Sequence, residues 1–160
     1  MRIRPFRPDD LDGLVQLTID TFGPFYEESF RPALGEVVFR HQHGDWRDDY
    51  RAEVPTFHAP AENRFVAVAE DDDGVAGYVG WSADPDHGRG VVTIVAVRRG
   101  RRRGGLGTAL CEHAFADLRS RGIVIVAIGT GGDDFHAPAR ALYERLGCSP
   151  FPGVYYFREL

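Results

Sequence analysis

The second half of the chain carries a regular pattern of apolar and polar positions. Short apolar runs alternate with segments whose apolar residues recur every three or four positions, which predicts strands alternating with helices. The run 91–97 is almost entirely apolar, so we expect a central strand covered on both faces, and 123–128 should be buried in the same way. The remaining predicted elements are strands 65–69, 75–82 and 155–157, a hairpin turn at 71–74, and helices 105–121 and 137–146.

The first sixty residues are less regular. Arg2–Phe6 predicts a strand, and the helical spacing of apolar residues over 11–22 predicts a helix that Gly23 and Pro24 should end. A second helix is expected over 34–43, followed by a looser aromatic segment. The whole pattern predicts one domain, residues 1–160, of the α/β (α+β layered) class, with a mixed central sheet and helices on both faces.

Composition and charge narrow the function classes. A chain of 160 residues with 43% hydrophobic content can bury one core. The formal net charge of −5 argues against general nucleic-acid binding. Cys111 and Cys148 are far apart and lack metal-ligand spacing, so we expect reduced thiols and no metal. No signal-peptide pattern follows Met1 and no run could span a bilayer, which predicts a cytoplasmic protein without membrane contact.

A loop rich in arginine and glycine joins the predicted strand 91–97 to the predicted helix 105–121. The first amides of a helix and the positive end of its dipole bind anions. Gly105 and Gly107 should let the backbone approach a ligand, and the arginines can reach phosphates. The dinucleotide-binding and Walker patterns are absent. A basic run can also be a nucleic-acid patch or a solvated loop, but its place in an acidic protein favours a phosphate ligand.

Two segments resemble the GNAT superfamily of acyl-CoA-dependent N-acetyltransferases. Arg102–Gly107 matches the motif Gln/Arg-x-x-Gly-x-Gly/Ala, and Ala139–Cys148 is similar to the family's A-x-x-L-Y-x-x-x-G-F helix. Both motifs occur in the family's order, and the resemblance covers residues 64–160 well. It implies a GNAT-like domain whose fourth and fifth strands splay apart.

The resemblance also implies acetyl-CoA as co-substrate and assigns residues to it. The pantetheine arm would pair with the backbone of Ile94, Val95 and Val97. Tyr143 would donate a proton to the leaving thiolate, although it could instead only pack in the core. His136 stands where the family often has Asn, and with Ala139 it should lie beside the ligand. The pyrophosphate would take the amides of Arg102, Arg103, Gly104, Gly105, Leu106, Gly107 and Thr108.

The general base is not evident from the sequence. An amine with a pKa of about 10.4 is protonated at pH 7 and must lose a proton before it attacks. Many relatives place Glu on the fourth strand, but this chain has Thr93 there. Ordered water could accept the proton, and each side-chain candidate could instead be a solvated loop residue or a helix cap. The candidates are Asp133 and His136 after the fifth strand, and also Asp134, Glu70, Asp84 and His87.

An aromatic segment occupies the place where the family builds its acceptor site. Phe25, Tyr26, Trp46 and Tyr50 could wall a pocket for an organic amine, or could belong to the core or a dimer contact. His41 and His43 lack the support a metal site would need. The acids that could attract the charge of the amine are Glu27, Glu28, Asp45 and Asp48.

The leading hypothesis is an enzyme that transfers an acetyl group from acetyl-CoA to a primary amine of a small molecule or peptide, by direct attack in a ternary complex. Amides of the fourth strand would polarise the thioester carbonyl. An alternative is an acyl-CoA-binding regulatory module without turnover. A nucleic-acid-binding domain is a third hypothesis, and the resemblance leaves a homodimer open.

Overall fold

The computed structural model describes residues 1–160. The strands are β1 (Arg2–Pro5), β2 (Arg64–Asp71), β3 (Gly74–Asp84), β4 (Arg89–Val97) and β5 (Ile125–Ile128). The helices are α1 (Leu11–Pro24), α2 (Arg31–His43), α3 (Trp46–Glu53), α4 (Leu106–Ser120) and α5 (Ala137–Arg145), with a π-helical segment, Phe25–Phe30, between α1 and α2. None of the helices is both long enough and apolar enough to cross a membrane.

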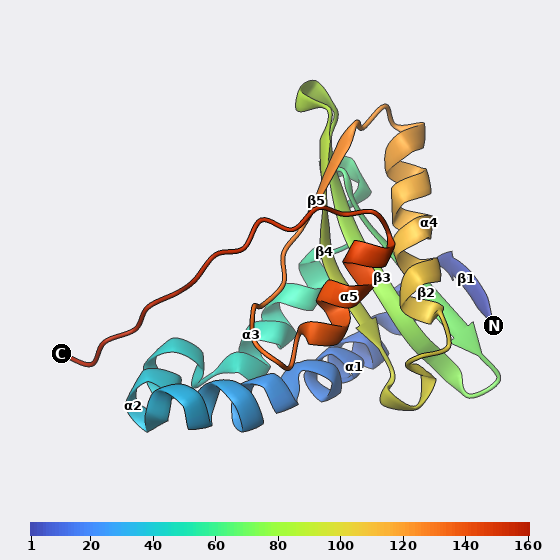
Figure 1. Cartoon of the computed structure of the whole chain (residues 1–160). Coiled ribbons are helices and arrows are strands. Elements are labelled where there is room, and N and C mark those ends of the chain that lie inside the picture. Colours follow the sequence, from blue (N-terminus) through green and yellow to red (C-terminus); the bar gives the residue numbers. More distant parts are fainter.

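The five strands form one mixed sheet in the order β1-β2-β3-β4-β5 (Figure 1). The first three pairings are antiparallel, and β4 pairs with β5 in parallel. The predicted strands in 2–6, 65–69, 75–82 and 91–97 are confirmed within one or two residues at most ends. Gly74, with φ of 95°, follows the hairpin turn between β2 and β3 that Asp-Gly predicted.

Helices cover both faces of the sheet, as the sequence predicted. Val66 and Val68 of β2 belong to the buried cluster that includes Leu14 of α1. Ala67 and Ala69, which alternate with them, belong to the cluster around Leu110 and other residues of α4. Since successive side chains of a strand point to opposite faces, α1 and α4 lie on opposite sides of the sheet. Leu142 and Tyr143 of α5, and Leu146 just after this helix, pack against the α4 cluster.

A β-bulge interrupts β4 at Thr93. Gly80 of β3 pairs with Ile94 and Trp81 pairs with Val92, so Thr93 is the extra residue. The bulge changes which face the side chains occupy, because Val92 packs in the α4 cluster and Ile94 in the α1 cluster. The expected cover on both faces is therefore wrong for part of β4. Thr93 and its neighbour Val91 are exposed, since no helix packs over them.

The C-terminal end of the sheet differs from the prediction. The strand expected over 123–128 begins at Ile125 and is not buried, because β5 is an edge strand with no partner on its outer side. The strand expected over 155–157 is wrong. Residues 149–160 form no helix or strand and run away from the sheet toward α2 (Figure 1). A segment that lies on no sheet edge has no partners for strand hydrogen bonds.

The N-terminal helices extend beyond the predicted ends. α1 ends at Pro24, but Gly23 and Pro24 do not take the chain out of the helical conformation, because it continues directly into the π-helical segment. The second helix, α2, includes the predicted 34–43 but contains a kink at Gly35, where φ is 84°. The aromatic segment expected to be loose forms α3.

Candidate active site

The parallel ladder between β4 and β5 is short. It joins Arg89–Val92 to Ile125–Ile128, and β5 then ends. From Thr93 to Val97, β4 has no strand partner on the β5 side, so the expected splay is present. The backbone of Ile94, Val95 and Val97 lies in this open half. Such a strand offers unpaired N–H and C=O groups to an extended ligand.

The loop after β4 leaves a row of amides unpaired at the start of α4. Ala109 is the first residue of this helix to donate a backbone hydrogen bond, 3.0 Å to the carbonyl of Gly105. The amides from Gly104 to Thr108 donate to no acceptor in the protein. Gly105 has φ of 80°, which glycine adopts without strain. A helix start with free amides is a site for phosphate groups.

The arginines of this loop fall into two groups. Arg98 donates to the carbonyl oxygens of Asp73 and Val75. Arg101 pairs with Asp71 and Asp73, with N–O distances of 2.7 and 2.6 Å, so both arginines fasten the loop to the β2–β3 hairpin. No carboxylate pairs with the other three, which are Arg99, Arg102 and Arg103. Arg102 donates from Nε to the carbonyl oxygen of Val97 at 3.1 Å, so Arg99 and Arg103 are the two with no partner in the protein.

Gly107 has a packing role that the sequence did not indicate. A Cβ at this position would lie 3.1 Å from Cδ2 of Leu142 in α5. Gly107 therefore allows the start of α4 to approach the second half of α5 closely. Leu142 is followed by Tyr143, so this contact places the amide-lined loop and the tyrosine on two helices that touch.

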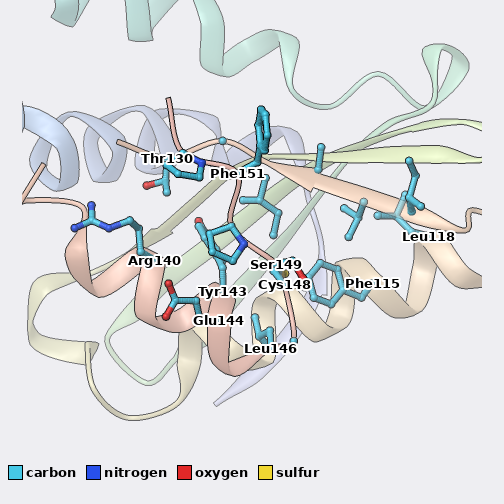
Figure 2. Close-up of a pocket in the computed structure, with 18 of the residues that line it drawn as sticks. Phe115, Leu118, Thr130, Arg140, Tyr143, Glu144, Leu146, Cys148, Ser149 and Phe151 are labelled. Atoms are coloured by element: carbon cyan, nitrogen blue, oxygen red, sulfur yellow. The ribbon is translucent and has the colours of Figure 1, made fainter. Parts of the chain in front are cut away.

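Tyr143 is partly buried against the α4 cluster. Burial raises the pKa of its phenol to about 12, so the hydroxyl is protonated at neutral pH. Its ring also lines a cavity of about 700 Å³ between β5, α4 and α5 (Figure 2). A neutral hydroxyl that borders a cavity can donate a proton to a ligand there. A tyrosine that only packed in the core would not need this position.

Asp133 and His136 form a hydrogen-bonded pair in the turn between β5 and α5. Nδ1 of His136 lies 2.7 Å from Oδ2 of Asp133. Burial opposes ionisation of Asp133, but the hydrogen bond from His136, the charge of His136 and backbone hydrogen bonds together lower the pKa of the carboxyl below its usual value. An ionised carboxylate only accepts hydrogen bonds, so Nδ1 carries the proton, and in the neutral imidazole the lone pair is on Nε2.

Two residues that the sequence analysis missed hold this pair in place. Arg140 donates from Nη1 to the carbonyl oxygens of Gly131 and Asp133, at 2.6 Å each. A Cβ on Gly131 would lie 2.3 Å from Oδ2 of Asp133 and 2.4 Å from Nδ1 of His136. The glycine run after β5 was the available sequence signal for a crowded turn, and Arg140 lies one helical turn after His136.

The other candidate bases are engaged elsewhere. Glu70 pairs with Arg2 and Arg4 on the β1 side of the sheet. Asp84 and His87 bind each other at 2.9 Å in the hairpin before β4, at the opposite end of that strand from the open half. The side chain of Asp134 does not cap α5, because Asp133 supplies the carboxylate that accepts the His136 amide.

The aromatic segment packs mainly on itself. Trp46 is buried, stacks on Tyr26 at 4.8 Å between ring centroids, and donates to Glu27. The hydroxyls of Tyr26 and Tyr50 lie 3.1 Å apart. These three aromatic residues therefore join the helices together, which agrees with the core interpretation for Trp46 in particular.

Phe25 is the aromatic residue that reaches the turn after β5. Its ring centroid lies 4.8 Å from that of His136 and 5.8 Å from that of Phe135. Among the charged candidates, Glu27 pairs with Arg31 and Arg47, and Asp48 with Arg51. His43 packs between Phe30 and Tyr26, and burial lowers the pKa of its imidazole. No group of three or more His, Cys, Asp or Glu side chains is arranged to hold a metal ion.

An open strand, a helix start with free amides and a protonated tyrosine beside a cavity are the features that the resemblance to an acyltransferase predicted. The family model of the acetyltransferase (GNAT) family matches residues 19–148. The chain belongs to this family.

Comparisons with individual proteins agree with this assignment. A mycothiol acetyltransferase from Beutenbergia cavernae is 37% identical over 83 residues, which are 52% of this chain and 27% of that protein. The match thus spans about a quarter of the length of that curated relative. A structure described as a GNAT-family acetyltransferase from Desulfovibrio desulfuricans superimposes with a TM-score of 0.72 at 25% identity, covering 94% of this chain and 86% of the other.

A more distant structure has the same fold. An aminoglycoside antibiotic 6'-N-acetyltransferase from Acinetobacter haemolyticus gives a TM-score of 0.67 at 17% identity, covering 100% of this chain and 99% of that one.

Proposed function

We propose that residues 1–160 form a single N-acetyltransferase domain that transfers an acetyl group from acetyl-CoA to a primary amine of a small molecule or peptide. The amine attacks the thioester directly in a ternary complex. The observation that carries this proposal is the open half of β4, Thr93–Val97, which lies next to the free amides of the α4 start. The GNAT family in general uses acetyl-CoA as its co-substrate.

The chain has groups suited to each part of acetyl-CoA. The free amides from Gly104 to Thr108 would hold the pyrophosphate, with help from Arg102 and Arg103. The backbone groups of Ile94, Val95 and Val97 that face away from β3 would hold the pantetheine amides, with the Val97 carbonyl already accepting a hydrogen bond from Arg102. Ala139 lies in the first turn of α5, on the same helix as Tyr143. Acetyl-CoA supplies the activated acyl group.

His136 is the proposed general base. Asp133 fixes its tautomer, so Nε2 can accept the proton of the amine as the N–C bond forms. The ring of Phe25 lies against the imidazole and limits its rotation. Asp133 acts through His136, and Arg140 and Gly131 act through Asp133, so these three are positioning residues.

Tyr143 is the proposed general acid. When the C–S bond breaks, the thiolate needs a proton, and the phenol is protonated because its pKa is raised to about 12. Amides of the open half of β4 would stabilise the charge on the carbonyl oxygen.

The acceptor would approach from the side of the aromatic segment. Phe25 lies closest to the turn with His136. Its ring contacts Tyr26, which in turn packs against Tyr50 and the buried Trp46. The Acinetobacter haemolyticus neighbour acetylates an aminoglycoside antibiotic. That neighbour supports a small polyamine-like acceptor as the first class to examine.

The test is release of free CoA thiol from acetyl-CoA in the presence of a panel of amines. We expect at least one primary amine to accelerate release, and His136→Ala to lower kcat by about 100-fold, the usual contribution of a general base. Binding of acetyl-CoA with no acceleration by any amine would contradict the proposal and indicate a regulatory acyl-CoA-binding module.

A further inference from the structure

Four phenylalanine side chains lie outside both buried clusters of the sheet, and we call them the phenylalanine cluster. They are Phe25 and Phe30 of the π-helical segment, Phe135 of the turn after β5, and Phe157 near the end of the chain. The first three are partly buried, and Phe157 is 38% exposed. Because these rings pack against neither face of the sheet, the packing of the core does not account for where they lie.

The rings of the phenylalanine cluster contact one another although they come from three separate parts of the chain. The ring centroid of Phe25 lies 5.8 Å from that of Phe135 and 6.0 Å from that of Phe30. Phe30 lies 5.6 Å from Phe157, whose segment ends beside α2 (Figure 1). Aromatic pairs attract each other at these separations. The cluster is therefore a partly open apolar surface of the kind that binds a ligand or partner.

The phenylalanine cluster ends at the proposed general base. The imidazole of His136 lies 4.8 Å from the ring of Phe25 and 4.9 Å from the ring of Phe135, measured between centroids. None of the four rings lines the cavity beside Tyr143, so the cluster is a separate surface. An apolar group that binds to it would lie next to the histidine that accepts the proton of the amine.

The charges around the cluster suit an acceptor with a single ammonium group. Glu27 is already paired with Arg31 and Arg47. Glu28 and Asp134, which are close to the rings in sequence, are exposed to solvent and can attract a cation. Phenyl rings offer no hydrogen-bond partner to the hydroxyls and further ammonium groups of a polycation such as an aminoglycoside, and burying such groups unpaired is costly.

We propose that the phenylalanine cluster binds an aromatic ring of the acceptor, and that the acceptor is a primary amine joined to this ring by a short alkyl linker. The inference rests on the proposed function, because it names the acceptor of that reaction. The ring of the acceptor would add edge-to-face contacts to the cluster, and the linker would bring the amine to His136.

Two sources of amine share this chemistry. A free arylalkylamine such as 2-phenylethylamine and a peptide whose first residue is phenylalanine both carry the nitrogen on the second carbon from the ring. Each has a matched amine without the ring, which is propylamine for the first and triglycine for the second. Comparison within each pair isolates the contribution of the ring.

The first experiment measures kcat/KM for release of CoA thiol with these amines, with phenylalanyl-glycyl-glycine as the peptide and spermidine as a polycation. We expect at least one aromatic amine to exceed its matched amine by about 10- to 100-fold, the effect of burying a group of this size. The faster of the two aromatic amines identifies the source. If each matched amine, or spermidine, reacts as well as the aromatic amines, the inference is overturned and the proposed function stands. If no amine accelerates release, the proposed function fails and the inference with it.

The second experiment removes rings from the protein. Phe30→Ala and Phe157→Ala should each lower the kcat/KM ratio between the aromatic amine and its matched amine by about three- to tenfold, mainly through the KM of the aromatic amine. Phe157 lies outside the core, so its replacement tests the cluster even if Phe30→Ala does not fold. Tyr156→Ala is the matched control, because Tyr156 is the preceding aromatic residue and is 92% exposed. Ratios that stay at the value of Tyr156→Ala in both variants would overturn the inference.

Discussion

Nδ1 of His136 lies 2.7 Å from Oδ2 of Asp133, and a Cβ on Gly131 would meet both atoms. The pair therefore occupies space that only glycine at position 131 leaves free. Both residues belong to the turn that carries the chain from β5 to α5. A histidine held in one tautomer by a carboxylate is a common arrangement for a general base.

Gly131→Ala should disrupt this pair, because the new methyl group would lie 2.3 Å from the Asp133 carboxylate. We expect kcat to fall by about 30- to 100-fold, approaching the loss in His136→Ala. Gly132→Ala is a matched control, since a Cβ there meets nothing within 4 Å. Steady-state kinetics of the two variants side by side checks this. Equal activities would show that the pair does not depend on the space at Gly131.

Tyr143→Phe should lower kcat by about 10- to 100-fold, because the thiolate loses its proton donor. Burial raises the pKa of Tyr143 to about 12, and its proton is therefore retained as the pH rises through 8 and 10. Any alkaline decrease in kcat below pH 11 should then be the same in wild type and Tyr143→Phe. A decrease near pH 10 that disappears in the variant would contradict this assignment of the pKa.

Arg103→Ala should raise the KM for acetyl-CoA about tenfold, since a charge-assisted contact to a phosphate contributes roughly 1.5 kcal/mol. Arg101→Ala is the matched control. Arg101 pairs with Asp71 and Asp73 of the β2–β3 hairpin, so its loss should lower stability and leave KM within about twofold. Titration of acetyl-CoA at two salt concentrations tests both. A larger increase in KM for Arg101→Ala than for Arg103→Ala would mean that the ion pairs of Arg101 with Asp71 and Asp73 break, so that Arg101 can bind the ligand.

The stability of the fold should depend on Asp10 at low pH. Arg4 donates to both oxygens of Asp10 at 2.8 Å, and these hydrogen bonds lower the pKa of the buried carboxyl. Because the pKa is lower in the folded state than in the unfolded state, the stabilisation is present above about pH 4 and is lost as the pH falls further. Asp10→Asn should cost about 3 kcal/mol at pH 7 and flatten this acid dependence.

Urea denaturation at pH 3 to 7 provides the measurement, with Asp12→Asn as the control. Asp12 is exposed, so its change should stay within about 0.5 kcal/mol. A difference between wild type and Asp10→Asn that stays constant from pH 7 to pH 3 would indicate lost packing instead of a lost ion pair.

Local patterns were sufficient to predict most of the sheet and its helices. Apolar runs located β2, β3 and β4, and the Arg102–Gly107 motif indicated the loop whose amides are unpaired in the structure. The bulge at Thr93 could not be predicted, because it depends on how β4 pairs with β3 rather than on the composition of β4.

The same distinction applies to the candidate site and to the C-terminal end. Asp133 and His136 were candidates on sequence, but their contact depends on a turn crowded by Gly131 and fastened by Arg140. The composition of 155–157 is that of a strand, yet strand formation also requires an edge on which to pair. The prediction that β5 is buried was wrong for the same reason, since burial depends on a neighbouring element, and the local sequence pattern does not show whether one is present.

The contact between Gly107 and Leu142 fixes the distance between α4 and α5. Gly107 belongs to the helix start with the free amides, and Leu142 adjoins the tyrosine. The two helices touch there, so the distance between the free amides that would bind the phosphates and the tyrosine that would lie at the thiol is fixed. A thioester whose linker is shorter than pantetheine would bind the free amides with its phosphates but would not bring its sulfur to Tyr143. Gly107→Ala would push the two helices apart, and the protein would then discriminate less strongly between thioesters of different linker length.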